Sequence, residues 1–429
     1  MMTELSTASG AAGAGIALHG DWQQALAQAI ERARTQLEDV AAPPDEAAEQ
    51  PPVDLALLFA SAHYADDFPD IVTAARAAAH ARLLVGCSGT GVIGPKREIE
   101  QQPALSVLLL RLPGVQLTPR YITQDTLDAA DADDEHEDQL APALHDALGP
   151  DASAARAWLL FADPFRLDVE ALVVGMAQTF PDAAVVGGLA SGHQWQRKTH
   201  LFIDDGDQPV PVRDEGALLI GLGGDWTVQT LVAQGCIPIG EPWTITESEG
   251  PIIHTIAGRP ALDVLVDTLE ALPPEVQRRA QRGGPFVGLA VDEHRTTLGP
   301  GDFLVRNLLG FDRERGVIAV GAHPQVGQTL QFHLRDRAAA DEELHSMLSA
   351  VETEDAAAPP LAALLCSCTG RGAGLFGTPD HDADAVARAL GPLPLAGFFC
   401  NGEIGPVGQR SYVHGYTASL ALLVHAPPE

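Results

Sequence analysis

The sequence has very little lysine, few cysteines and no long apolar run. Lysine occurs only at positions 96 and 198, and the formal net charge is −32. Such an acidic surface repels nucleic acids and anionic membranes, so we expect neither as a partner. No apolar stretch reaches the roughly 18 residues of a membrane-spanning helix, which excludes a helical membrane protein at this stage.

The five cysteines, at positions 87, 236, 366, 368 and 400, are an odd and sparse set. Three of them fall inside or at the ends of predicted strands, which favours a reduced cytoplasmic protein over a disulfide scaffold. The first thirty residues lack a basic stretch before their apolar ones, so we expect no secretion signal. We predict a flexible tail with a helix over residues 1–50.

A short motif occurs three times, each time after an apolar, strand-like run. Its copies are Cys87-Ser88-Gly89, Ala190-Ser191-Gly192 and Cys400-Asn401-Gly402. About thirty residues before each copy lies another apolar run, and a segment of helical period separates the two runs. Strand, helix and strand at this spacing predict a parallel βαβ unit with a right-handed crossover.

After each motif the chain shows a further apolar run, and the first two lead into a turn and a returning segment that predict hairpins. The predicted fold class is therefore α/β, with repeated βαβ-plus-hairpin units forming mixed sheets in two related domains. The pattern changes near residue 235, where a turn-rich segment precedes an amphipathic helix and a strand meander over 285–334. We therefore predict domains at 51–235 and 236–429.

Acidic residues are densest over 125–138. Carboxylates are ligands for hard cations, but this stretch lacks the glycine turn and the terminal glutamate of a calcium loop. We interpret it as a solvated linker or helix start, and whether it binds cations stays open.

Five segments, at 86–91, 235–242, 258–262, 305–310 and 397–408, together resemble the FIST proteins, over roughly residues 50 to 426. The resemblance implies a cytoplasmic sensory module with an N-terminal and a C-terminal FIST region. It also implies a small ligand, such as an amino acid. The sequence outside 50–426 has no room for a kinase, a receptor or an F-box, so we expect the signal to pass through a separate protein partner.

Ser88, Ser191 and Asn401 are the first candidates for ligand binding. Ligands of open α/β sheets sit beyond the carboxyl ends of parallel strands, where these residues are expected, each followed by a glycine such as Gly89 or Gly402. The alternative is structural, because glycine supplies the backbone freedom of a turn and Ser or Asn caps nearby backbone groups.

Three charged residues, Glu403, Arg306 and Arg371, are further candidates, and the repeat does not require Glu403 or Arg306. Glu403 stands where the other copies have Thr90 or His193, and it can hold a ligand ammonium, pair with an arginine or simply face solvent.

Arg306 interrupts the apolar run 303–309, where its guanidinium can bind a carboxylate of a ligand or of Glu403, or form a structural ion pair. Arg371 lies in a glycine-rich loop that lacks the spacing and the lysine of a phosphate loop.

Two chemical alternatives remain beside a sensor. A hydrolase or transferase would use Cys400 or Cys87 with Glu403, but no histidine is paired with either thiol by sequence. A soft metal at Cys366, Cys368 and Cys400 lacks a C-x-x-C pair or clustered histidines. We therefore predict no catalytic residues, no metal and no cofactor. A third hypothesis is an interaction scaffold that docks partners on its acidic face.

Overall fold

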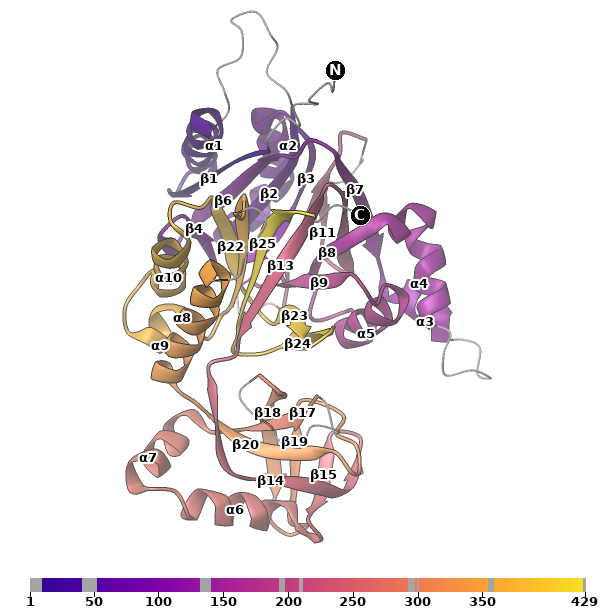
Figure 1. The fold of residues 1–429 in the computed structure, drawn as a ribbon, viewed down its shortest axis with the longest axis vertical. Coiled ribbons are helices and arrows are strands. Elements are labelled where there is room, and N and C mark those ends of the chain that lie inside the picture. The colour runs from indigo at the N-terminus through magenta and orange to yellow at the C-terminus, as the bar shows by residue number, and fades with distance from the viewer. Residues whose placement is uncertain are drawn as a thin grey trace, which may run out of the picture. The chain divides into compact units, whose positions relative to one another are not determined.

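The computed structural model describes residues 10–40, 52–131, 140–192, 197–207, 211–291, 298, 301–353 and 359–426, which group into two compact units (Figure 1). Unit 1 takes its residues from 1–232, 347–413 and 418–429, and unit 2 from 233–346 and 414–417. The first junction lies at 232/233, close to the boundary predicted near 235. The chain then returns to unit 1 at 347, so the two units do not follow the predicted division at 235/236.

Unit 1 contains three six-stranded sheets that share one strand plan. Their orders are β1-β6-β2-β3-β10-β11, β7-β12-β8-β9-β23-β24 and β13-β25-β21-β22-β4-β5. In each sheet the third and fourth strands are parallel, and a helix connects them. The predicted α/β fold of repeated βαβ-plus-hairpin units in mixed sheets is confirmed, with all three βαβ units in unit 1.

The first βαβ unit is β2 (Val53–Ser61), α2 (Phe68–Ala79) and β3 (Ala81–Gly89). The second is β8 (Ala155–Ala162), α5 (Val169–Thr179) and β9 (Ala184–Leu189). The third is β21 (Ala362–Cys368), α10 (His381–Leu390) and β22 (Leu395–Cys400), with the short α9 (Gly372–Phe376) before α10. We call them repeats 1, 2 and 3.

A hairpin follows each repeat and joins the sheet of a different repeat. The hairpins are β4 (Gly91–Gly94) with β5 (Arg97–Glu100), β10 (Leu201–Asp204) with β11 (Val212–Arg213), and β23 (Glu403–Val407) with β24 (Arg410–His414). The hairpin of repeat 1 pairs with β22, that of repeat 2 with β3, and that of repeat 3 with β9. The exchange is therefore cyclic.

Antiparallel strands complete the three sheets. They are β1 (Ala11–Leu18), β6 (Ala104–Arg111), β7 (Val115–Ile122), β12 (Ala217–Gly224), β13 (Trp226–Ala233) and β25 (Ala418–His425). The edge position that β7 and β13 fill in two sheets is filled by β1 in the remaining sheet.

The Gly/Ala-rich start of the chain is thus a strand where we expected a loose tail. It packs closely against α1 (Trp22–Val40): a Cβ on Gly13 would meet the Ala33 carbonyl oxygen at 1.9 Å, and one on Gly15 the Ala29 oxygen at 2.0 Å. The small residues that resemble a disordered tail are what lets the helix approach the strand. The rest of the predicted tail, 1–9 and 41–50, lies outside the described residues.

The core of unit 1 lies between the three sheets and beneath the helices that cover them. Phe59, Phe161 and Phe398 meet at its centre, with ring centroids 5.0 to 6.1 Å apart. Helices α1 and α2 bury their apolar faces on the first sheet, as Figure 1 shows. Helices α4 (Leu140–Leu148) and α5 do the same on the second.

The strand registers place the repeated motif differently from the sequence comparison. Gly86, Gly187 and Gly397 lie opposite Leu58, Leu160 and Leu365, and a Cβ on any of the three glycines would come within 2.0 Å of the opposite carbonyl oxygen. These glycines are therefore equivalent. Counting from them, Gly89-Thr90-Gly91 matches Ala190-Ser191-Gly192 and Cys400-Asn401-Gly402, so the first copy is shifted by two residues.

The same counting changes the counterpart of Glu403. Ile93 and Ile404 lie opposite Gly397 and Gly187, respectively, so Glu403 is equivalent to Val92 and not to Thr90. His193, the counterpart proposed in the second copy, lies outside the described residues. Ser88 is equivalent to Leu189 and Phe399, which are apolar.

The described residues of unit 2 form one antiparallel sheet with two complete helices and part of a third, which continues into unit 1. Its strand order is β14-β20-β17-β18-β19-β15-β16, and β14 also pairs with β15. The four strands predicted over 285–334 are present, but the meander covers β17, β18 and β19, because β20 pairs with β17 and β14 and not with β19. No βαβ unit occurs among the described residues of unit 2, so the two units are not related by the repeat. The elements are β14 (Cys236–Glu249), β15 (Ile252–Ile256), β16 (Arg259–Pro260), α6 (Ala261–Glu270), α7 (Pro274–Gly283), β17 (Pro285–Ala290), β18 (Phe303–Asp312), β19 (Val317–Val320) and β20 (Thr329–Arg335).

Helix α8 (Arg337–Thr353) crosses the junction at 346/347. In the acidic stretch, α3 (Gln124–Asp131) is the helix start that we expected, and residues 132–138 lie outside the described residues. Among the described residues no helix combines the length and the apolar character that crossing a membrane requires.

Candidate functional site

The three strand ends meet in a ring of hydrogen bonds around the equivalent residues Thr90, Ser191 and Asn401. The Asn401 amide donates to the Leu189 carbonyl at 3.0 Å, and the Ser191 amide donates to the Ser88 carbonyl at 3.0 Å. At the third position the Ser191 hydroxyl accepts from the Thr90 amide at 2.8 Å and donates to the Phe399 carbonyl. One serine side chain thus completes the ring.

The other strand-end candidates are also occupied by backbone groups. The buried Ser88 hydroxyl donates to the Ser191 carbonyl at 2.8 Å and accepts from the His200 amide at 3.0 Å. The exposed Asn401 donates from its side chain to the Ala190 carbonyl at 3.1 Å. A Cβ on Gly89 would meet the Gly91 carbonyl oxygen at 2.5 Å, and the Gly402 carbonyl accepts from Leu189. These contacts match the structural alternative.

A second group of residues forms a buried charged cluster at the end of repeat 3. Arg371, between β21 and α9, is 1% exposed and makes a bidentate pair with Asp382 in the first turn of α10, at 2.8 and 3.0 Å. Ser367 donates to the same carboxylate at 2.9 Å, and His381 lies 3.0 Å from it. Burial lowers the pKa of the arginine, but the charge and hydrogen bond of Asp382, together with the charges of Glu403 and Cys368, offset this, so the pKa is raised.

Asp382 is held ionised by the same contacts. Burial alone would raise the pKa of its carboxyl group, but Arg371 lowers it, and so does the hydrogen bond from His381. The net result is a pKa well below the ordinary range of an aspartate. The charge of Arg371 is therefore neutralised inside the cluster.

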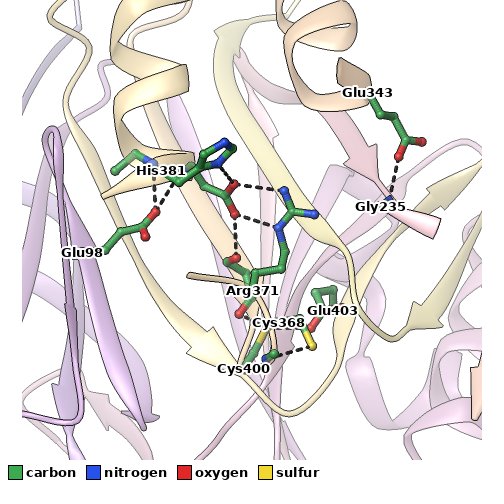
Figure 2. Close-up of polar contacts among 12 residues, drawn as sticks. Glu98, Gly235, Glu343, Cys368, Arg371, His381, Cys400 and Glu403 are labelled. Carbon is green, nitrogen blue, oxygen red and sulfur yellow. Dashed lines mark hydrogen bonds and ion pairs between the residues drawn. The ribbon is translucent and has the colours of Figure 1, made fainter. Parts of the chain in front are cut away.

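One donor of the cluster remains available. The Nη1 atom of Arg371 is buried and has no hydrogen-bond partner among the described residues. Glu403, the first residue of β23, is fully buried. It lies close enough to Arg371 for its charge to raise the pKa of the arginine. Figure 2 shows Arg371 between Glu98 and His381 on one side and Glu403 and Cys400 on the other.

Cys400 lies against Glu403. Its thiol donates toward the Glu403 carboxylate and the Ser367 carbonyl, both at 3.2 Å. Burial raises the pKa of this thiol well above its usual value, and the Glu403 charge raises it further. Cys87 and Cys366 are buried, and burial raises the pKa of each. None of the three has the electropositive surroundings that activate a catalytic thiol.

Glu98 and Glu100 reach the cluster from repeat 1, through the exchanged hairpin. Oε1 of Glu98 accepts from the Asp382 and Ala383 amides at 2.9 and 3.0 Å, and its Oε2 is buried without a partner among the described residues. Burial, followed by the charge of Asp382, raises the pKa of Glu98 to about 8. Glu100 accepts from the Ala373 amide at 2.8 Å.

Two family descriptions match this chain. The FIST N domain matches residues 54–259, and the FIST C domain matches residues 261–406. The chain belongs to the FIST family. The FIST boundary near 260 falls inside unit 2, so the two named regions are not the two compact units.

Relatives of this FIST protein occur in mycobacteria. An uncharacterised protein of Mycobacterium tuberculosis is 35% identical over 412 residues, which is 96% of this chain and 99% of the relative. Another, from Mycobacterium bovis, is 36% identical over 414 residues, covering 96% and 98% of the two chains.

Two solved structures of cyanuric acid hydrolases were also found. One aligns with a TM-score of 0.31 and 10% identity, covering 97% of this chain and all of the hydrolase. The other, from A. caulinodans, has a TM-score of 0.34 and 9% identity, covering 98% of this chain.

Within this FIST protein, the structure brings some predicted site residues together and separates others. Arg371 and Glu403 share the buried cluster, and Ser88, Ser191 and Asn401 share the ring. Arg306 lies half-buried on β18 of unit 2, whereas Glu403 belongs to unit 1.

Four residues of the cluster were not predicted from the sequence: Asp382, Glu98, Ser367 and His381. Asp382 lies in the acidic run 380–384, which resembles a solvated helix start. Glu98 follows Lys96 and Arg97, and a charged run of this kind is also typical of a solvent-exposed segment. Among the described residues no group of three or more His, Cys, Asp and Glu side chains is arranged to hold a metal ion.

Proposed function

We propose that this FIST protein is a cytoplasmic sensor that binds a small polar ligand, of which an amino acid fits best, at Arg371 and Glu403. The observation that carries the proposal is the buried Nη1 of Arg371, which has no partner among the described residues and lies beside a buried carboxylate. A buried polar group without a partner costs about 1–3 kcal/mol, which a ligand can recover.

The charges of the cluster define the ligand that suits it. Arg371 and Asp382 neutralise one another, so Nη1 offers a hydrogen bond to a carboxylate or carbonyl oxygen without excess positive charge. The Glu403 carboxylate already accepts from the Cys400 thiol at 3.2 Å, and a cationic or N–H donor group of the ligand would add to that contact. A zwitterion such as an α-amino acid meets both requirements with one molecule.

A separate protein partner would receive the signal. The family membership supports a sensory role of this kind, and the acidic surface supports a partner that is neither nucleic acid nor membrane. The cysteine-dependent enzyme gains no support, because the thiols of Cys87 and Cys400 are buried and burial raises their pKa.

Calorimetry of the purified full chain against the twenty amino acids and a set of small organic acids tests the proposal. Glu403→Gln should weaken binding of the best amino acid by about 30-fold or more, because removing one partner of a buried charged contact costs about 2 kcal/mol or more. Arg371→Lys should have a similar effect. The arginine guanidinium can pair with Asp382 through two N–H groups and still offer Nη1 to a ligand, whereas a lysine ammonium lacks this forked geometry.

Arg388→Lys is the matched control, because Arg388 is an exposed arginine of α10 that pairs only with Asp384 among the described contacts. It should bind like the unmodified protein. If no amino acid or organic acid gives heat, and mass spectrometry of the denatured protein releases no small molecule, the proposal fails.

A further inference from the structure

The segment 369–383 contributes Arg371 and Asp382 to the buried cluster and is hydrogen-bonded to β21 and β22 and to the exchanged hairpin of repeat 1. This segment carries Arg371 and α9, and ends in the first turn of α10 that carries Asp382. Because Arg371 and Glu403 are buried, a molecule can reach them only if the structure around them moves, and movement of this segment would carry Arg371 with it. What holds the segment therefore affects access to Arg371.

Strand β5 holds the segment through Glu98 and Glu100. The Glu98 amide donates to Asp380 Oδ1 at 2.7 Å, and Oε1 of Glu98 accepts the Asp382 and Ala383 amides. Further along, Glu100 accepts the Ala373 amide, and a Cβ on Gly372 would lie 2.6 Å from the Glu100 carboxylate. Two acidic side chains thus cap two helix N-termini at opposite ends of the segment.

The two carboxylate oxygens of Glu98 differ in their hydrogen bonding. Oε2 is buried with no partner among the described residues, and Glu98 is 6% exposed. The groups around it are mostly acidic: Asp380 and the ionised Asp382 from the α10 side, and Glu100 from its own strand. Arg371 is occupied by Asp382, and His381 also points to Asp382. The two amide donors favour the ionised form of Glu98, but burial and the charges of Asp382 and Glu100 outweigh them, so the closed arrangement favours its neutral form.

We propose that Glu98 and Glu100 form an acidic clamp that closes the segment 369–383 over Arg371, and that loss of the Glu98 proton loosens it. The effect on ligand access rests on the proposed function, whereas the clamp itself does not.

The direction of the pH effect follows from the difference in the pKa of Glu98 between the closed and the open state. The pKa of Glu98 is about 8 when the clamp is closed and near its ordinary value of 4.5 when it is open. The closed state therefore holds a proton that the open state loses between pH 4.5 and 8, so closing is fully favoured below this window and weakens as the pH rises through it. Above pH 8 both states are ionised and the dependence ends.

Hydrogen exchange measured by mass spectrometry from pH 5 to 9 tests the clamp without any ligand. After correction for intrinsic exchange, peptides covering 369–384 should lose protection as the pH rises to 8, by at most about tenfold for each pH unit, and then level off. Glu98→Gln keeps the accepting oxygen but cannot ionise, so its protection should not change with pH. Arg388→Lys, at an exposed arginine of α10 outside the clamp, is the control and should keep the pH dependence.

A pH dependence in Glu98→Gln equal to that of the unmodified protein, or its absence from the unmodified protein, overturns the clamp. The Glu98→Gln comparison also separates Glu98 from His381, the other titratable group beside Asp382. If the calorimetry detects no ligand but hydrogen exchange shows the pH dependence expected of the clamp, the ligand proposal is wrong and the clamp proposal holds.

Discussion

Repeats 1 and 3 share a backbone and differ in what it carries. At the strand ends, repeat 1 has Ser61, Gly89 and Val92 where repeat 3 has Cys368, Cys400 and Glu403, as the registers establish. Ser61 donates nothing to a charged cluster; its hydroxyl accepts the Ala104 amide at 3.0 Å. The comparison teaches that the fold needs the glycines opposite Leu58 and Leu365, whereas the charges of repeat 3 are an addition.

The largest expected effect comes from removing the charge that only repeat 3 contains. Arg371→Met leaves Asp382 buried without its cation, and breaking a buried ion pair in this way costs about 3–5 kcal/mol. Urea unfolding should show this loss. Arg388→Met is the control, because its exposed pair with Asp384 is worth no more than about 0.5 kcal/mol. Equal losses in the two variants would mean that the buried pair has no special role.

The second largest effect is expected from disrupting the close contact between neighbouring strands that the repeats share. Gly397→Ala places a Cβ 1.9 Å from the Leu365 carbonyl oxygen, and forcing the two strands apart should cost about 1–3 kcal/mol. Gly374→Ala in α9 has no atom within 4 Å of the added Cβ and should be neutral or slightly stabilising. Thermal unfolding of both variants checks the pair. An unchanged melting temperature for Gly397→Ala would contradict the assigned equivalence.

A smaller effect concerns the ring where the repeats meet. Ser191→Ala removes the hydroxyl that joins the Thr90 amide to the Phe399 carbonyl, and should cost about 1–2 kcal/mol. Ser153→Ala, at an exposed hydroxyl 3.4 Å from His145, should cost nothing measurable in the same unfolding experiment. If both variants unfold alike, the ring contributes no stability through this side chain.

The smallest effect is expected from a thiol reagent. Cys400 of repeat 3 and Cys87 of repeat 1 are both buried, so iodoacetamide at neutral pH should leave them intact in the folded protein while half-buried Cys236 reacts first. Peptide mapping after timed alkylation gives the order. Rapid modification of Cys400 would revive the enzyme hypothesis.

The sequence was sufficient to predict the three βαβ units, because apolar runs flanking a helical period are local signals. The strand β1 could not be predicted, since the glycines that let α1 approach it resemble a loose tail. The repeat register was misplaced by two residues, although Ile-Gly-Pro at 93–95 and 404–406 carried the correct spacing. The number of residues between the equivalent glycine and that tripeptide aligns repeats 1 and 3 correctly, whereas the similarity of the three-residue motif does not.

The site was predicted in part, for reasons that are also physical. Glu403 stood out because the repeat does not require a carboxylate there, and Arg371 because it is a cation in a glycine-rich loop. Asp382 and Glu98 did not stand out, because a buried acidic residue in a charged run looks like a solvated one until the chain folds around it. The clamp joins residues nearly three hundred positions apart, and no local pattern indicates such a pairing.

The cyclic exchange of hairpins has a consequence for how the chain can fold. No sheet of unit 1 can be completed until its strands from distant parts of the chain are present, since β4 and β5 of repeat 1 need β22 of repeat 3. Such a high contact order predicts slow folding. A fragment cut at the boundary between the FIST N and FIST C domains would retain β4 without β22 and β9 without β23. Its bare strand edges would make it prone to aggregate, so the two named domains form one folding unit.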